Sequence, residues 1–137
     1  MLFKDVYGHG GSKRLAWVDL TSKFGQLRFD HSGARMIRGP ITLRAFLREH
    51  GDASARHPPI DFHRRDVVLV TTGPRSSTGY EPRILRVVEQ RRRVVVTVRE
   101  ETPSLGQTVR AGLRYPYRLI TIPKLGKAFY VETLGRP

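Results

Sequence analysis

The 137-residue sequence contains no cysteine. This absence excludes disulfide bonds, thiolate catalysis, cysteine-ligated zinc and a lipid-modified cysteine within the chain. Long apolar runs are also missing, since no stretch approaches the roughly 20 residues that a membrane-spanning helix needs. The first residues, MLFKDVYGHGG, lack the apolar segment and the cleavage site of a secretory signal. The default expectation is a cytoplasmic protein without a transmembrane segment, or an extracytoplasmic one if the sequence is a processed, mature form.

Acidic residues are scarce. The chain has 12 Asp and Glu residues and 25 Lys and Arg residues, which gives a net charge of +13. This excess has two interpretations that the sequence leaves open. It is either compositional, because Arg greatly outnumbers Lys, or it serves an acidic partner such as nucleic acid, another polyanion or an acidic protein. Under the second interpretation the candidate polyanion contacts are Arg83, Arg86, Arg91, Arg92 and Arg93.

Catalytic and metal-binding patterns are also absent. The five histidines show no metal-ligand spacing. Glu100 and Glu101 are adjacent, so on a strand they point to opposite faces and cannot act as a paired acid and base. Ser76 and Ser77 are not in a G-x-S-x-G elbow, and the GHGGS segment at 8–12 lacks the Lys-Ser/Thr of a phosphate loop. We therefore expect no enzymatic activity, no cofactor and no metal site.

The first part of the chain, 1–57, reads as short strands followed by one helix. Residues 13–20 and 26–30 alternate between apolar and polar, as strands do. Leu43, Phe46 and Leu47 then follow helical spacing. This pattern predicts an amphipathic helix over about 43–50, with Thr42 as N-cap and Gly51 at its end, covering one opening of a β core.

The second part, 58–137, is predicted to be a β core that follows a linker over 51–60. DVVLVTT (66–72) is almost wholly apolar and β-branched, which predicts a central strand buried on both faces. A long hairpin follows, with Val94, Val96 and Val98 on a buried face and the alternate residues solvated. Further short strands with Gly and Pro between them predict one domain, mainly β, an antiparallel Ig-like sandwich or barrel.

The segment GPRSSTGYEP (73–82) joins two of these strands and is the main candidate for partner binding. Gly79 permits a positive φ, and Tyr80 can pin the loop, which is a purely structural interpretation. The alternative is a rigid loop that displays short polar groups and an arginine to a partner. Alanine at Arg75 and Ser77 should then weaken binding and leave folding intact. The candidate residues are Arg75, Ser76, Ser77, Thr78, Gly79 and Tyr80. A second candidate loop, Tyr115, Pro116 and Tyr117, lies either beside the first loop or at the far end.

Several short motifs in fixed order resemble one family. In chain order these motifs are PPIDF–HRRDVVLV, Thr78-Gly79-Tyr80, Glu101-Thr102-Pro103, Tyr115-Pro116-Tyr117 and Ile122-Pro123-Lys124. Over about 58–131 this order resembles the C-terminal domain of the PrcB family, named for an accessory subunit of a secreted bacterial protease complex. The resemblance implies a non-catalytic partner or stabiliser of other proteins. The family usually reads PTGGY where this chain reads SSTGY.

The same SSTGY loop is similar to the NPTTGY loop of chagasin-type cysteine-protease inhibitors, which are Ig-like sandwiches. Those inhibitors insert three loops into a protease cleft, but Ser104-Leu105-Gly106 is not a Gly-rich tip and Tyr115-Pro116-Tyr117 resembles their R-P-aromatic loop only faintly. The resemblance therefore implies the fold type, and protease inhibition is kept as an alternative. Three functions therefore stay open: a non-enzymatic subunit that docks on another protein or multi-subunit assembly, a basic structural protein of a ribonucleoprotein or virus particle, and a protease inhibitor.

Overall fold

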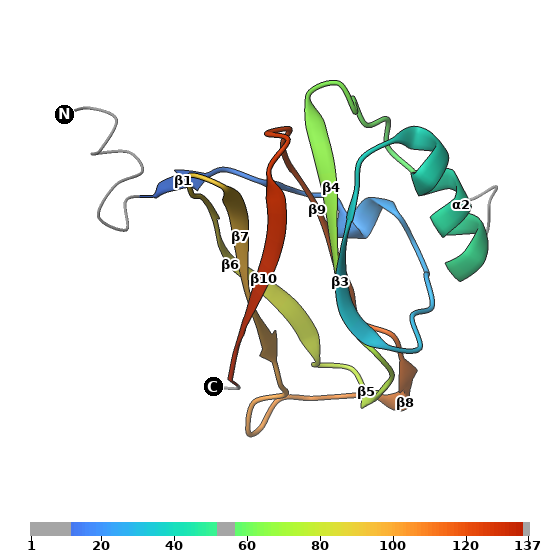
Figure 1. Ribbon diagram of the computed structural model, residues 1–137. Coiled ribbons are helices and arrows are strands. Elements are labelled where there is room, and N and C mark those ends of the chain that lie inside the picture. The colour runs from blue at the N-terminus through green and yellow to red at the C-terminus, as the bar shows by residue number, and fades with distance from the viewer. Residues whose placement is uncertain (1–11, 52–56, 136–137) are drawn as a thin grey trace.

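A computed structural model describes residues 12–51 and 57–135 of the chain. Two four-stranded sheets pack face to face, and one helix covers the far side of one of them (Figure 1). The prediction of a mainly β sandwich with a single helix is therefore confirmed for the described residues. Residues 8–11 of the GHGGS segment and linker positions 52–56 lie outside the described residues.

Sheet A contains, in spatial order, β1 (Lys13–Leu15), β6 (Glu81–Glu89), β7 (Arg93–Glu101) and β10 (Ala128–Leu134). Sheet B contains β2 (Val18–Asp19), β9 (Tyr117–Pro123), β4 (Arg65–Thr72) and β3 (Ser32–Ile37). A separate ribbon pairs β5 (Arg75–Ser77) with β8 (Ala111–Arg114). Strands from the first third of the chain thus complete both sheets. One pair departs from the antiparallel expectation, because β10 runs parallel to β7.

Strand β4 is buried on both faces, as its sequence predicts. Val68 and Val70 belong to the core between the two sheets. Val67 and Leu69 point to the opposite side and belong to a second core beneath the helix. The molecule therefore has three layers, and β4 lies in the middle one.

The helix α2 (Pro40–His50) begins earlier than the predicted 43–50. Gly39 is the N-cap and Pro40 takes the first turn, where a missing N–H costs nothing and the fixed φ suits a helix. Leu43, Phe46 and Leu47 are buried as expected. The helix does not cover an opening of the core; these three side chains pack on the outer face of sheet B.

The segments before the helix differ from their predicted strands. Residues 13–20 split into β1 and β2, which join different sheets. Residues 26–30 form no strand, although Leu27 and Phe29 are buried. Their alternation comes from packing beneath α2, where the Arg28 N–H donates to the His50 carbonyl at 2.8 Å. The apolar pattern was correct, but no strand in the described part of the chain pairs with this segment to form a ladder.

The outer face of β7 is more buried than the alternation predicts. Val95 and Thr97 are only 8% and 2% exposed. Thr97 lies between Arg86 of β6 and Glu132 of β10, whose long side chains form an ion pair at 3.6 Å. Such side chains cover apolar surface with their stems, so a central strand can be shielded without a third layer.

Candidate docking site

The β5–β8 ribbon brings the two predicted loops together at one end of the sandwich (Figure 1). Arg75 pairs with Arg114 across the ribbon, directly before the second loop. The Thr78 N–H donates to the Arg110 carbonyl at 3.0 Å, and the Arg110 N–H donates to the Thr78 hydroxyl at 2.9 Å. The second loop thus lies beside the first. We call this region, residues 73–82 and 102–117, the loop end.

Arg75 points inward from the first loop. Its Nε donates to Glu100 Oε2 at 2.7 Å and its Nη2 donates to Glu100 Oε1 at 2.9 Å. Both side chains are about one-fifth exposed. The hydrogen bond to Glu100 raises the pKa of the Arg75 guanidinium above its ordinary value. This two-point pair ties the loop to β7, so Arg75 anchors the loop from within.

The other loop residues are also engaged internally. The Ser77 hydroxyl donates to the Thr78 carbonyl at 3.0 Å. Gly79 has φ +98°, and Tyr80 is half-buried. Ser76 is the exposed member of the six candidates. Contact of these residues with a partner stays a prediction.

Gly79 sits where no other residue fits. A Cβ there would lie 2.8 Å from Pro103 Cγ, in addition to the strain of the positive φ. We expect Gly79→Ala to lower the free energy of unfolding by about 1–2 kcal/mol. Gly106→Ala is the matched control, because Gly106 has a similar φ of +83° but nothing within 4 Å of a Cβ. Urea unfolding should therefore show a larger loss for Gly79→Ala; equal losses would exclude the Pro103 clash as a cause.

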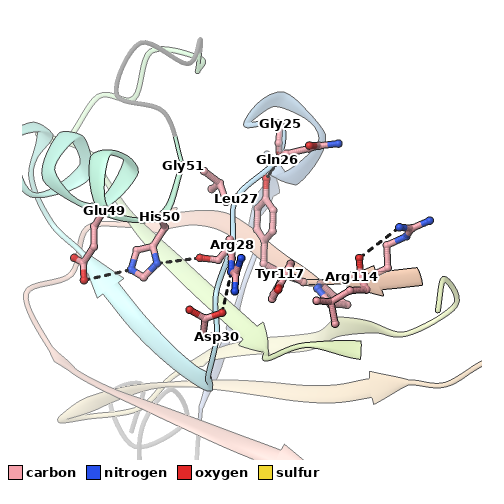
Figure 2. A pocket seen from close by; sticks show the side chains of 13 residues that line it. Gly25, Gln26, Leu27, Arg28, Asp30, Glu49, His50, Gly51, Arg114 and Tyr117 are labelled. Atoms are coloured by element: carbon pink, nitrogen blue, oxygen red, sulfur yellow. Dashed lines mark hydrogen bonds and ion pairs between the residues drawn. The ribbon is translucent and has the colours of Figure 1, made fainter. Parts of the chain in front are cut away.

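A cleft of about 950 Å³ opens beside the second loop (Figure 2). Three segments that are distant in sequence form its walls: the chain before β3, the last turn of α2, and the stretch from β8 to β9. Its lining comprises Gly25, Gln26, Leu27, Arg28, Asp30, Glu49, His50, Gly51, Leu113, Arg114, Tyr115, Pro116 and Tyr117.

His50 holds two walls of the cleft together. Its Nδ1 lies 3.0 Å from the Arg28 carbonyl, and its ring packs against Phe29 and Phe46 at centroid distances of 4.8 and 4.5 Å. Figure 2 shows this ring between Glu49 and the Arg28 backbone. The Arg28 side chain meanwhile lies over the Tyr115 ring at 4.9 Å. The walls therefore present aromatic faces and mixed charges, which suit binding.

Tyr117 fixes the floor of the cleft. Its hydroxyl donates to the Gly25 carbonyl at 2.6 Å, and burial raises its pKa to about 12. The folded-state pKa lies above the ordinary value of about 10, so the protonated Tyr117 hydroxyl stabilises the folded protein fully below pH 10. This stabilisation is lost as the pH rises toward 12. Tyr117→Phe should lower stability at neutral pH and reduce the decline between pH 10 and 12. Thermal unfolding across that range checks this; an unchanged alkaline decline would assign it to other groups.

Sequence reasoning missed the contribution of the chain before β3 to this cleft. The signal was available: Leu27 and Phe29 alternate with Gln26, Arg28 and Asp30, so burial of the first set turns the second set outward. The pattern could not predict which segment forms the opposite wall of the cleft, because that depends on the positions of β8 and β9 in the fold.

The predicted polyanion contacts divide between two places. Arg83 and Arg86 lie on the outer face of sheet A, where they pair with Glu101 and Glu132. Arg91, Arg92 and Arg93 lie in and beside the β6–β7 turn, at the opposite end of the sandwich from the loop end.

That opposite end, which we call the basic end, concentrates much of the positive charge. Strand pairing and turn contacts bring the start of β1, the end of β3, the start of β4, and the β6–β7 and β9–β10 turns together there. Its acidic residues are Asp61, Asp66 and Glu89, and the last two are buried against Lys124 and Lys127. Its basic residues are Lys13, Arg14, Arg38, Arg64, Arg65, Arg91, Arg92, Arg93, Lys124 and Lys127.

Over residues 12–51 and 57–135, no three His, Asp or Glu side chains gather closely enough to hold a metal ion. In the same ranges no helix is both long and apolar enough to cross a membrane.

One comparison with known proteins matches part of the β core. Residues 67–123 match the family model described as PrcB C-terminal, which confirms the predicted resemblance over this segment. The match runs from β4 to the end of β9 and includes both candidate loops. No curated protein and no solved structure matches the chain.

Proposed function

Because residues 67–123 match the family model described as PrcB C-terminal, we propose that the protein is a non-enzymatic subunit that docks on and stabilises another protein, through its loop end. The family name itself points to an accessory role in a protease complex. A protein partner follows from that role, and among the described residues the loop end carries three of the six exposed large hydrophobic side chains.

Exposed apolar side chains carry this proposal. Of the six large hydrophobic residues that are exposed in the described parts of the chain, three belong to one short stretch of the loop end. They are Leu105 (106% exposed), Val109 (40%) and Leu113 (63%). Isolated exposed apolar residues are ordinary, but several on one loop beside a cleft are typical of an interaction surface. Leu113 also lines the cleft.

The loop end is also tied to the sandwich and across its own ribbon, which favours tight docking. Its first loop is anchored by the Arg75–Glu100 pair, and the ribbon bonds between Thr78 and Arg110 join it to the second loop. A surface that is already ordered loses little conformational entropy on binding.

The test compares apolar residues at two places. Immobilised wild-type protein is incubated with native host extract, and captured proteins are quantified by mass spectrometry. Leu105→Ser with Leu113→Ser should reduce recovery of a stoichiometric partner by about tenfold or more, as expected when central apolar contacts are lost. Ile41→Ser is the matched control, because Ile41 is 81% exposed but lies on α2. Equal recovery with all three proteins would overturn the proposal.

The inhibitor alternative is tested by assaying a papain-type protease with excess protein. Unchanged protease activity would exclude this alternative.

A second candidate function is binding of a nucleic acid at the basic end. It is favoured by the ratio of ten basic to three acidic side chains there, with two of the acids already neutralised by lysine. Binding of labelled RNA should weaken steeply with salt, since each neutralised phosphate releases a counterion. Arg92→Glu with Arg93→Glu should reduce binding, whereas Arg110→Glu with Arg114→Glu, at the loop end, should not. Absent or salt-insensitive binding would contradict this candidate.

A further inference from the structure

Strand β10 forms one edge of sheet A. Among the described residues β10 is the last strand of sheet A, and no strand pairs with it on the side away from β7 (Figure 1). Its seven residues, AFYVETL, pair with β7 in continuous register without a bulge. Natural edge strands are usually protected by lysine, proline, bulges or short length. β10 has no lysine, proline or bulge, and Glu132 is its one charged side chain, so its free backbone groups are available for pairing.

We propose that β10 pairs antiparallel with β10 of a second copy of this chain, so that two A sheets join into one continuous sheet. A two-fold symmetric contact requires the strand to be complementary to itself. Val131 is the midpoint of Ala128–Leu134. A two-fold axis at Val131 therefore pairs all seven residues, and it sets Tyr130 opposite Glu132 of the partner subunit.

The side chains on the outer face match this register. Tyr130 is 52% exposed, and the Arg93 guanidinium lies over its ring at 5.1 Å. Glu132 of the partner subunit would face this pair of side chains, and symmetry makes the contact twice. On the inner face Val131 would meet its own counterpart, a favourable β-branched pair.

Other symmetric registers are poorer. An axis at Glu132 sets two carboxylates directly opposite each other, which is destabilising. An axis at Tyr130 removes the Glu132 contact with Tyr130. Each of these alternatives also pairs only five of the seven residues. Charge and overlap therefore both favour Val131 as the centre.

The net charge gives the dimer a distinctive salt dependence. Two chains of charge +13 repel each other at long range, and this repulsion opposes dimerisation. Salt screens separated charges more than contacts at the interface. The dimer should therefore strengthen as salt rises, which is the opposite of nucleic-acid binding at the basic end.

The first experiment is analytical ultracentrifugation of the full chain over a concentration series at low and high salt. Glu132→Lys sets like charges opposed at both symmetric contacts and should raise the dimer Kd by about tenfold. Glu101→Lys is the matched control, since Glu101 is on the same outer face but at the end of β7, paired with Arg83. Adding Arg93→Glu to Glu132→Lys reverses the charges across the interface and should restore much of the affinity.

Cysteine cross-linking tests the register, and the absence of native cysteine makes each variant single-site. Val131→Cys lies at the symmetry axis, within the about 4.4–6.8 Å Cα separation of a disulfide, and should oxidise to a covalent dimer. Thr133→Cys is four residues from its own counterpart, about 13 Å along the strand, and should not. A monomer at every concentration and salt, a dimer unaffected by Glu132→Lys, or equal cross-linking at both positions would each overturn the proposal.

Discussion

Lys124→Met is expected to lower the free energy of unfolding by about 3 kcal/mol, since removal of one partner from a buried ion pair leaves the other charge uncompensated. The orphaned group is Asp66, which is 2% exposed and accepts a hydrogen bond from Lys124 Nζ at 2.6 Å. Lys124 is the larger and more solvated partner, with its side chain 34% exposed. The cost of the variant therefore arises mainly at the carboxylate that stays behind in β4.

A double variant separates this cause from lost packing. Asp66→Asn combined with Lys124→Met removes both charges, so it should recover a large part of the stability that Lys124→Met alone loses. Arg64→Met is the surface control, because that side chain is 85% exposed beside Asp61 and should change stability by less than about 0.5 kcal/mol. Urea unfolding of wild type, Lys124→Met, Asp66→Asn and the double variant gives the double-mutant cycle, with Arg64→Met measured beside them. A double variant that is no more stable than Lys124→Met would refute the orphaned-charge explanation.

The fold was predictable where one segment carries its own signal. The run Val67–Val70 specifies a strand buried on both faces, whatever covers it, and Leu43, Phe46 and Leu47 specify one face of a helix. Residues 26–30 show the limit, because alternation reports which side chains are buried but not whether a partner strand is available. The parallel β7–β10 pair likewise depends on where the chain goes after β9, which is a property of the whole sandwich.

The candidate site was predictable to a similar degree. The two loops were identified from sequence, but their neighbourhood depends on the β5–β8 ribbon, which carries no strong strand pattern. The inward position of Arg75 did have a signal. Glu100 continues the alternation of Val94, Val96 and Val98, so it had to lie on the buried face. A carboxylate on a buried face requires a cation, and strand parity alone could have directed attention to an arginine on a nearby loop.

Arg75→Met is accordingly expected to lower stability by about 2 kcal/mol, less than for a fully buried pair because Arg75 and Glu100 are each about one-fifth exposed. This differs from the expectation that alanine at Arg75 leaves folding intact. The substitution removes three hydrogen bonds, two to Glu100 and one to the Pro74 carbonyl, and leaves the Glu100 carboxylate facing the interior between the sheets without its arginine. The first loop should loosen from β7, so amide hydrogen exchange in 75–78 and 110–114 should accelerate together.

Two further variants make this prediction specific to the pair. Arg83→Met is the matched control, because Arg83 pairs with the neighbouring Glu101 on the outer face while 65% exposed, and such pairs contribute about 0–1 kcal/mol. Arg75→Met with Glu100→Gln should be more stable than Arg75→Met alone, since the carboxylate that loses its two guanidinium hydrogen bonds is then absent. Equal losses for Arg75→Met and Arg83→Met would mean that the inner pair adds nothing beyond a surface contact. The double variant can also test whether docking requires the loop attachment that the Arg75–Glu100 pair supplies. If its stability is close to that of wild type while its loop end exchanges amide hydrogens faster, partner recovery by the two proteins can be compared directly.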